Sequence, residues 1–196
     1  MNLPNKLTTS RIVLTLVFLI AVFREFPGNR TLALVIFVIA SVTDWLDGAI
    51  ARRRKLITNF GILMDPLADK ILTCSAFIAF VGHGYVAAWM VVVVVARELA
   101  ITGLRLLAAS KNVVLAAERY GKHKTISQMI TVSVILLQES YPEWGRIGQT
   151  IFGFQIGGQS WVHHVAFVSL WLTVALTFIS GWLYLWRNRQ LYLDDM

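Results

Sequence analysis

The stretch that decides the fold is Asp44-Trp-Leu-Asp-Gly-Ala-Ile-Ala-Arg52, followed after eight residues by Gly61-Ile-Leu-Met-Asp-Pro-Leu-Ala-Asp69. It places four carboxylates, two glycines and one arginine at fixed spacing inside a chain that is 57% hydrophobic. An ionisable side chain within a membrane is costly, so such residues mark a functional site by default. Four carboxylates at helical spacing therefore predict a site.

The rest of the chain has the composition of a membrane protein. Only 15% of its residues are charged, against about 25% in ordinary soluble domains, and its mean hydropathy is +0.65. We predict six transmembrane helices, each offering roughly the 20 residues that cross a bilayer, over residues 8–24, 31–53, 60–82, 86–109, 121–139 and 160–187. The predicted fold class is therefore an all-α polytopic membrane protein.

The connecting segments suggest a single domain over residues 1–196, because no linker or break in composition interrupts the chain. Residues 2–6 are a mixture of polar and apolar side chains, which predicts a short interfacial segment before the first helix. Residues 139–160 contain Pro142 and several glycines. We expect them to form an irregular segment outside the membrane.

The net charge of +7 could indicate nucleic-acid binding, but the placement of the basic residues argues for a different partner. With six helices, all of the 18 Lys and Arg residues except Arg24, Arg30 and Arg146 fall on the side of the two termini. Basic residues gather on the cytoplasmic side of membrane proteins. The charge therefore indicates cytoplasmic termini and contact with membrane lipids, not nucleic acid.

The motif itself forms two acidic stripes. On a helix with about 100° per residue, its first half gathers carboxylates and small residues on one face: Asp44, Asp47, Gly48 and Ala51. Its second half forms a stripe at intervals of four residues: Gly61, Asp65 and Asp69. A short connection makes the two helices antiparallel neighbours, so both stripes are expected near the cytoplasmic side.

Four neighbouring carboxylates favour a divalent cation. Like charges raise one another's pKa values, so the carboxylates cannot all stay ionised without a counter-charge. A donor set made only of carboxylates suits Mg²⁺ or Mn²⁺ rather than zinc. A metal held in this way commonly acts on phosphates, and Arg52 is a natural phosphate partner. Pro66, which lies between the last two aspartates, would interrupt the helical hydrogen bonds there and leave a backbone carbonyl free.

The motif resembles the signature of the CDP-alcohol phosphotransferases, Asp-x₂-Asp-Gly-x₂-Ala-Arg-x₈-Gly-x₃-Asp-x₃-Asp, and it matches at every fixed position. The resemblance extends over nearly the whole chain, since residues 2–11 are similar to the start of the family's bacterial members. Residues 96–105, 121–125 and 180–184 resemble the branch that makes phosphatidylglycerophosphate.

The resemblance implies the CDP-alcohol phosphotransferase fold and a homodimeric enzyme of the bacterial cell membrane, with its active site facing the cytoplasm. It implies transfer of a phosphatidyl group from CDP-diacylglycerol to sn-glycerol 3-phosphate, which releases CMP. The implied ligands of one or two Mg²⁺ or Mn²⁺ ions are Asp44, Asp47, Asp65 and Asp69, and Asp69 is also the implied general base. The residues implied to bind CDP-diacylglycerol are Thr8, Arg11, Asp44, Gly48, Ala51, Arg52 and Gly61.

The acceptor needs its own cations, because a small phosphorylated alcohol is a dianion that two or three basic side chains can bind. Arg97, Glu98, Thr102 and Arg105 form a stripe on the fourth predicted helix, and basic residues open the fifth. The candidates for binding glycerol phosphate are Arg97, Arg105, Lys122 and Lys124. The alternative is that these residues follow the positive-inside rule and contact lipid phosphates.

Two other functions fit the same sequence. The first keeps the chemistry and changes the acceptor to phosphatidylglycerol, as in a cardiolipin synthase, to inositol phosphate, as in a phosphatidylinositol phosphate synthase, or to serine. The basic clusters weigh against serine. The second is a cation-coupled transporter. Transporters favour broken helices and repeated halves, whereas these carboxylates are asymmetric along the chain and lie near one end of their helices.

Overall fold

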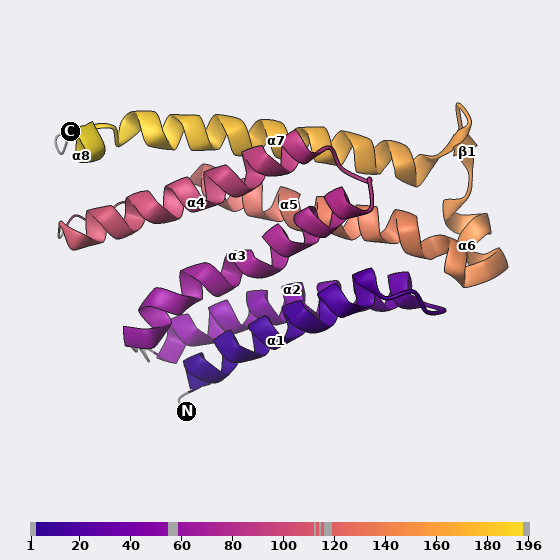
Figure 1. Ribbon diagram of the computed structural model, residues 1–196, viewed down its shortest axis with the longest axis horizontal. Coiled ribbons are helices and arrows are strands. Elements are labelled where there is room, and N and C mark those ends of the chain that lie inside the picture. The colour runs from indigo at the N-terminus through magenta and orange to yellow at the C-terminus, as the bar shows by residue number, and fades with distance from the viewer. Residues whose placement is uncertain (1–2, 55–58, 112, 114, 116–118, 194–196) are drawn as a thin grey trace.

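The computed structural model describes the backbone of residues 3–54, 59–111, 113, 115 and 119–193, and the side chains of residues 9–43, 70–111, 113, 115 and 124–192. Its long helices are α1 (Leu3–Phe23), α2 (Asn29–Arg54), α3 (Asn59–Gly82), α4 (Ala88–Ser110), α5 (Arg119–Ser140) and α7 (Trp161–Arg187). The helices alternate in direction (Figure 1). Both termini therefore lie at one end of the bundle, the terminal end, and the turns after α1, α3 and α5 lie at the other, the hairpin end.

The six predicted helical segments correspond to these six helices, with most bounds shifted by one to three residues. The first helix differs more, because α1 already begins at Leu3 and leaves no separate interfacial segment before it. Pro4 lies in the first turn of α1, where the missing backbone N–H of proline costs nothing and its fixed φ favours the helix. The predicted interfacial segment is thus the first turn of a spanning-length helix.

Among the described residues, α7 is the helix that is long and apolar enough to cross a membrane. Its 27 residues give a length of about 40 Å at 1.5 Å per residue. Within the same described part of the chain, the shorter apolar helical segments are Thr9–Phe23, Asn29–Thr43 and Lys70–Gly82. The predicted count of six membrane spans remains a prediction.

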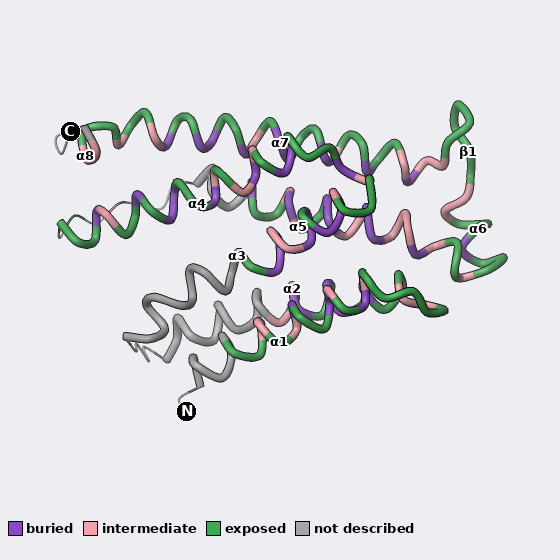
Figure 2. The backbone as a smooth tube through the Cα atoms, in the orientation of Figure 1, coloured by how far each residue is buried: buried purple, intermediate pink, exposed green. Residues whose placement is uncertain are grey.

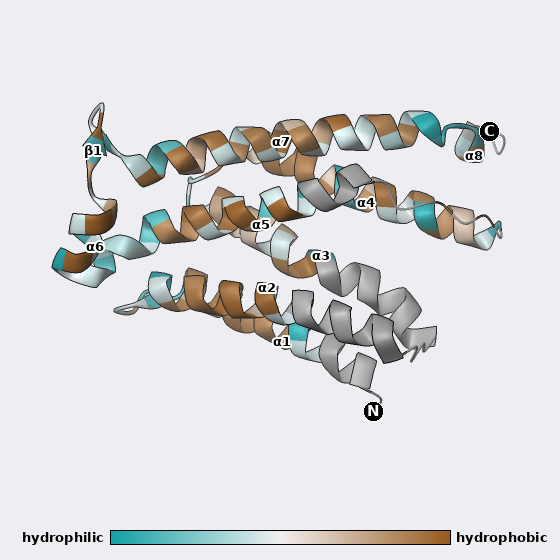
Figure 3. Ribbon diagram, turned by 180° about the vertical axis from the view of Figure 1, so that it is seen from behind, coloured by the Kyte–Doolittle hydropathy of each residue, from teal (hydrophilic) through white to brown (hydrophobic). Residues whose placement is uncertain are grey.

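The helices bury one face and expose apolar side chains on the other. In its described part, each long helix has both buried and exposed residues (Figure 2) and carries hydrophobic residues (Figure 3), and many large hydrophobic side chains are exposed. Val92, Leu99 and Val168 are each more than 60% exposed. Soluble monomeric proteins rarely expose so much contiguous apolar surface. This exposure therefore fits helices that face lipid.

The core between α1, α2 and α3 is built from aromatic rings. Phe18, Phe37, Phe77 and Phe80 are completely buried, and the ring centroids of Phe18 and Phe37 lie 5.8 Å apart. Such tilted ring pairs add about 0.5–1.5 kcal/mol to the free energy of burying their area. This packing fixes α1 against both α2 and α3, the two helices that carry the aspartate motif.

The second half of the bundle is joined by buried hydroxyl groups. α5 packs against α7 and α2, and α4 packs against α3 and α7. Between α5 and α7, the completely buried Thr131 donates a hydrogen bond to the carbonyl of Ser169 at 2.9 Å, and its hydroxyl lies 2.9 Å from that of Thr173. Hydroxyl groups that pair in this way let two helices approach closely without leaving a polar group unsatisfied.

The hairpin end is more ordered than the sequence predicts. The segment expected to be irregular contains a 3₁₀ helix, η1 (Tyr141–Trp144), the helix α6 (Gly145–Phe152) and a two-stranded hairpin of β1 (Gln155–Ile156) and β2 (Gln159–Ser160). The ring of Phe152 lies between those of Trp144 and Trp161, at centroid distances of 5.7 and 6.1 Å. These aromatic contacts hold α6 against η1 and the start of α7. The glycine-rich sequence did not predict them, because they join residues that are apart in the chain.

Glu143 of η1 joins this end of the bundle to the start of α2. Its carboxylate accepts hydrogen bonds from the backbone N–H of Arg30 at 3.3 Å and from the N–H and hydroxyl of Thr31 at 2.9 and 2.6 Å. Burial raises the pKa of Glu143, but these hydrogen bonds and the charge of Arg30 outweigh it and lower the pKa below its ordinary value of 4.5. Glu143 therefore caps α2 from a distant part of the chain.

We predict that Glu143→Gln lowers the free energy of unfolding by about 1 kcal/mol at pH 7, the usual cost of losing a helix cap. Because the folded-state pKa is depressed, the stabilisation is complete above the ordinary value of 4.5 and is lost as the pH falls through the folded-state pKa. Melting temperatures between pH 7 and pH 3 check this. The difference between wild type and variant should shrink with acid, whereas the exposed control Glu25→Gln should melt with the wild type throughout.

Candidate functional site

The two halves of the aspartate motif fall on α2 and α3, toward the terminal end of each helix. The motif's side chains lie outside the described residues, so the structure leaves their predicted roles open. The predicted site residues whose side chains lie outside the described part of the chain are Thr8, Asp44, Asp47, Gly48, Ala51, Arg52, Gly61, Asp65, Asp69 and Lys122. Arg11, on α1, is described and half-buried, and its backbone carbonyl accepts a hydrogen bond from Thr15 at 2.9 Å.

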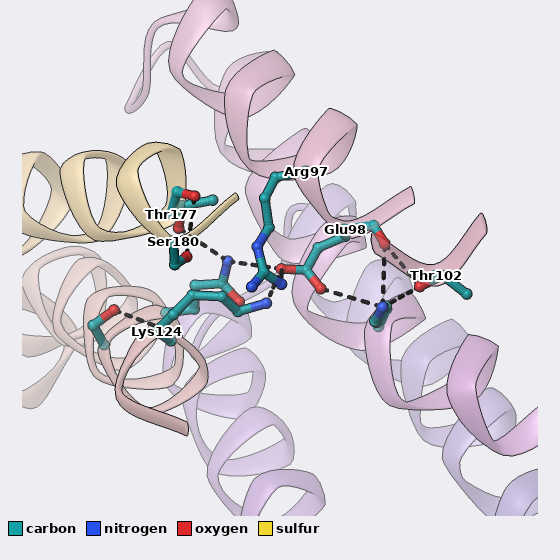
Figure 4. Close-up of polar contacts among 9 residues, drawn as sticks. Arg97, Glu98, Thr102, Lys124, Thr177 and Ser180 are labelled. Carbon is teal, nitrogen blue, oxygen red and sulfur yellow. Dashed lines mark hydrogen bonds and ion pairs between the residues drawn. The ribbon is translucent and has the colours of Figure 1, made fainter. Parts of the chain in front are cut away.

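The described part of the site is centred on Glu98, in the middle of α4. Its side chain is 3% exposed, although a buried carboxylate is stable only when it is paired and hydrogen-bonded. The backbone of Glu98 contributes as well, since its carbonyl accepts a hydrogen bond from the hydroxyl of Thr102 at 2.7 Å. The side chain of Glu98 points toward those of Arg97 and Lys124 (Figure 4).

Three cations from three helices meet the Glu98 carboxylate (Figure 4). Lys124 of α5 donates to Oε1, and Nη1 of Arg97 lies 3.5 Å from the same oxygen. Lys70 of α3 approaches the other oxygen, with Nζ 3.5 Å from Oε2. Lys70 also donates to the carbonyl of Glu98 at 3.1 Å and to the hydroxyl of Thr102. We name Lys70, Arg97, Glu98 and Lys124 the cationic cluster.

Polar groups from α5 and α7 complete the surroundings of the cluster. Nε2 of Gln128 lies 3.4 Å from Oε1 of Glu98 and 3.5 Å from the hydroxyl of Thr177. The side chain of Arg97 crosses α7 at Gly181, where an added Cβ would lie 2.7 Å from Cγ of Arg97. Glycine at this position therefore provides the space that lets Arg97 reach the cluster.

The cationic cluster is a buried site with an excess of positive charge. Among the described side chains, three basic groups surround one carboxylate, so basic groups outnumber acidic ones in this part of the site. Side-chain exposure is 12% for Arg97, 27% for Lys70 and 5% for Lys124, so bulk water screens this charge poorly. Such an arrangement attracts an anion, and arginine with lysine is the usual combination for a phosphate group.

The structure separates the acceptor candidates that the sequence grouped together. Arg97 and Lys124 converge on Glu98, whereas Arg105 lies two turns farther along α4, about 12 Å away by helical rise. Nε of Arg105 instead donates to the hydroxyl of Tyr184 at 3.4 Å, and its guanidinium lies 5.8 Å from the centre of that ring. Arg105 is therefore exposed beside α7 and is not part of the cationic cluster.

Sequence reasoning missed Glu98, Lys70 and Gln128 as site residues. Two signals in the sequence could have found the first two. Glu98 is a carboxylate in the middle of an apolar helix, which marks a functional residue by the same rule that identified the motif. Lys70 directly follows Asp69, so the cationic cluster begins one residue after the motif ends. Gln128 gives no such signal, because a lone glutamine on a membrane helix has many explanations.

The metal prediction depends on the motif's donor set. Among the described side chains, no three His, Cys, Asp or Glu residues come together as ligands, so a cation is not expected in the cationic cluster itself. The four aspartates of α2 and α3 provide only carboxylate oxygens, the donors that Mg²⁺ and Mn²⁺ prefer. These residues therefore fit the predicted ion by their chemistry.

Comparison with known proteins agrees with the motif. The family CDP-alcohol phosphatidyltransferase matches residues 1–179. A protein of Bacillus subtilis named CDP-diacylglycerol–glycerol-3-phosphate 3-phosphatidyltransferase is 39% identical over 199 residues, covering 95% of each chain. Proteins of the same name from Rickettsia felis and Haemophilus influenzae are each 34% identical, covering 93% and 69% of this chain and 93% and 75% of their own. The chain therefore belongs to the CDP-alcohol phosphatidyltransferase family.

Proposed function

We propose that this protein transfers the phosphatidyl group of CDP-diacylglycerol to sn-glycerol 3-phosphate, giving phosphatidylglycerophosphate and CMP. Relatives that match nearly the whole chain carry the name of this activity. The observation that supports this acceptor in the chain itself is the cationic cluster, which starts at Lys70, the residue after the proposed base Asp69. A phosphorylated acceptor held by the cluster would lie beside the motif.

The reaction would proceed by direct displacement at phosphorus. The acceptor hydroxyl oxygen attacks the phosphorus that bears diacylglycerol, the bond from that phosphorus to CMP breaks, and the hydroxyl proton passes to the carboxylate of Asp69. Arg97, Lys70 and Lys124 would bind the acceptor's phosphate and so orient its hydroxyl. Arg105, which lies nearer the terminal end of α4 than the cationic cluster, remains a further candidate for binding the acceptor. Lys122, whose side chain lies outside the described residues, is another.

The aspartates would hold a metal ion as well as take the proton. Asp44, Asp47, Asp65 and Asp69 would bind one or two Mg²⁺ or Mn²⁺ ions, which when bound neutralise the pyrophosphate and the leaving group. Beside them, the residues proposed to bind the CDP-lipid are Thr8, Arg11, Asp44, Gly48, Ala51, Arg52 and Gly61. Small residues at these positions would let a bulky nucleotide approach the helix backbone.

The cellular setting is part of the same proposal. We propose a multi-pass protein of the bacterial cell membrane whose terminal end, with the motif, faces the cytoplasm, where soluble glycerol 3-phosphate is available. The distribution of basic residues along the chain supports this orientation. The homodimer that the family resemblance implies belongs to the proposal, and cross-linking or mass measurement in detergent would test it.

Asp69→Asn tests the function most simply. The amide keeps the size of the side chain but cannot accept the proton, so CMP release with CDP-diacylglycerol and glycerol 3-phosphate should fall about 10³-fold, a typical contribution of a general base. The exposed Glu25→Gln should retain wild-type turnover. Activity of Asp69→Asn close to wild type would remove Asp69 as the base.

Removal of the metal is a separate test. EDTA should abolish CMP release, and an excess of Mg²⁺ or Mn²⁺ should restore it, because the pyrophosphate charge is then neutralised again. Zn²⁺ should restore it poorly, since the donor set contains neither His nor Cys. Turnover that is indifferent to the chelator would contradict the metal site.

Gly181→Ala tests the acceptor pocket. The added methyl group would collide with Cγ of Arg97 at 2.7 Å, and displacing Arg97 should raise the KM for glycerol 3-phosphate about 10-fold, the loss of one charge-assisted hydrogen bond. The KM for CDP-diacylglycerol should stay within about twofold. Gly103→Ala is the matched control, because a Cβ on that glycine of α4 meets no atom within 4 Å. Equal rises in both KM values would make Gly181 a purely structural residue.

A further inference from the structure

Glu98 occupies an unusual position for a carboxylate. It lies in the middle of α4, is 3% exposed, and has no place in the displacement chemistry proposed above. Burying an ionised carboxylate costs several kcal/mol unless partners offset the cost. A chain that only needed to bury this part of α4 could have used an apolar side chain, so the carboxylate calls for a functional reason.

The contacts of Glu98 supply that reason. Its Oε1 atom forms ion pairs with Lys124 and Arg97 and accepts a hydrogen bond from Gln128. Its Oε2 atom forms an ion pair with Lys70. These partners come from α3, α4 and α5, three helices that are otherwise joined by apolar packing in this region. Without a negative charge between them, the cations would repel one another in a poorly screened interior. Among the described side chains, Glu98 is thus the carboxylate that lets these three cations lie close together.

The basic character of the cluster suits the proposed acceptor. Among the described side chains, its three cations outnumber its one carboxylate, and a phosphate monoester carries about 1.5 to 2 negative charges at pH 7. A phosphodiester carries only one. The Glu98 carboxylate and an incoming phosphate would also seek the same donors, because both are oxyanions that bind lysine and arginine in the same way.

We infer that Glu98 is a positioning residue, an internal counter-ion that holds Lys70, Arg97 and Lys124 around one anion pocket and competes with the acceptor's phosphate for them. This inference rests on the proposed function for the identity of the acceptor. In the empty pocket, Glu98 keeps the cations in place. When the phosphate enters, it contacts the same cations as Glu98. The negative charge of Glu98 limits the affinity for phosphate, and its contacts keep the cations oriented for turnover.

Glu98→Gln tests this role because it removes the charge and keeps the shape. The pocket then carries one more positive charge, so inorganic phosphate should bind at least about 3-fold more tightly. Because Glu98 no longer competes for the cations or orients them, the acceptor should be bound more tightly but placed less well, and kcat with glycerol 3-phosphate should fall about 10-fold or more. Phosphate affinity is measured by calorimetry or by phosphate-induced stabilisation of the purified protein against heat. Thr131→Val, an equally buried change on α5 outside the cluster, should leave phosphate affinity and kcat within about twofold.

Tighter phosphate binding together with slower turnover is the signature of the proposed role, because a merely structural defect would weaken both. Phosphate affinity that falls with kcat, or two values that both stay at the wild-type level, would overturn the inference. The phosphate measurement needs no substrate. If the wild-type protein binds phosphate but releases no CMP with glycerol 3-phosphate, the proposed function is refuted. The phosphate affinities of wild type and Glu98→Gln would then still test the role of Glu98.

A double variant covers the case in which Glu98→Gln does not fold. Combining it with Lys124→Met removes both members of the closest ion pair, which is far less damaging than leaving one buried charge alone. The double variant loses one negative and one positive group, so the charge of the cluster is the same as in the wild type and phosphate affinity should lie at or below that of the wild type. A double variant that binds phosphate at least about 3-fold more tightly than the wild type would show that the charge balance does not govern the pocket.

Discussion

The contact between one buried carboxylate and three cations is the constraint on which the functional half of this bundle depends. Glu98 lies where α3, α4 and α5 converge, and each of these helices contributes a cation to it. The ion pairs fix the rotation of each helix about its axis, because a turn of one residue would move a charge into apolar surroundings. The register of Lys70 in turn fixes that of Asp69, its neighbour on α3. The placement of the motif and that of the cationic cluster are therefore coupled.

The opposite end of the molecule works by different means. There, aromatic rings hold α6 against η1 and the start of α7, and the Glu143 carboxylate holds η1 against the start of α2. Between the two ends the helices meet through phenylalanine side chains and a pair of threonines, with no buried ion pair among the described residues of that zone. Among the described residues, the ion pairs with a buried carboxylate thus lie in the cationic cluster, whereas the charged contacts of the hairpin end are exposed.

The sequence predicts helices well and their partners poorly. Long apolar runs flanked by basic residues predicted the six helices, because bilayer thickness and the helical rise per residue fix the length that such a helix needs. The prediction failed where local signals were ambiguous. Leu3 and Pro4 looked interfacial but start α1, and the glycines after Trp144 concealed α6, which depends on contacts with distant aromatic rings. The motif was evident from its spacing alone. Glu98, Lys70 and Gln128 were missed as a group because the contacts that unite them join residues 28 to 30 positions apart.

The most direct test of the account is a CMP-release assay on the purified protein with CDP-diacylglycerol, Mg²⁺ and one acceptor at a time. The acceptors are sn-glycerol 3-phosphate, glycerol, serine and phosphatidylglycerol. If the proposed function is right, glycerol 3-phosphate gives CMP release and a phosphatidylglycerophosphate product. Glycerol gives little release, because it lacks the phosphate that we propose the cationic cluster binds. Release with phosphatidylglycerol or serine, but none with glycerol 3-phosphate, would contradict it.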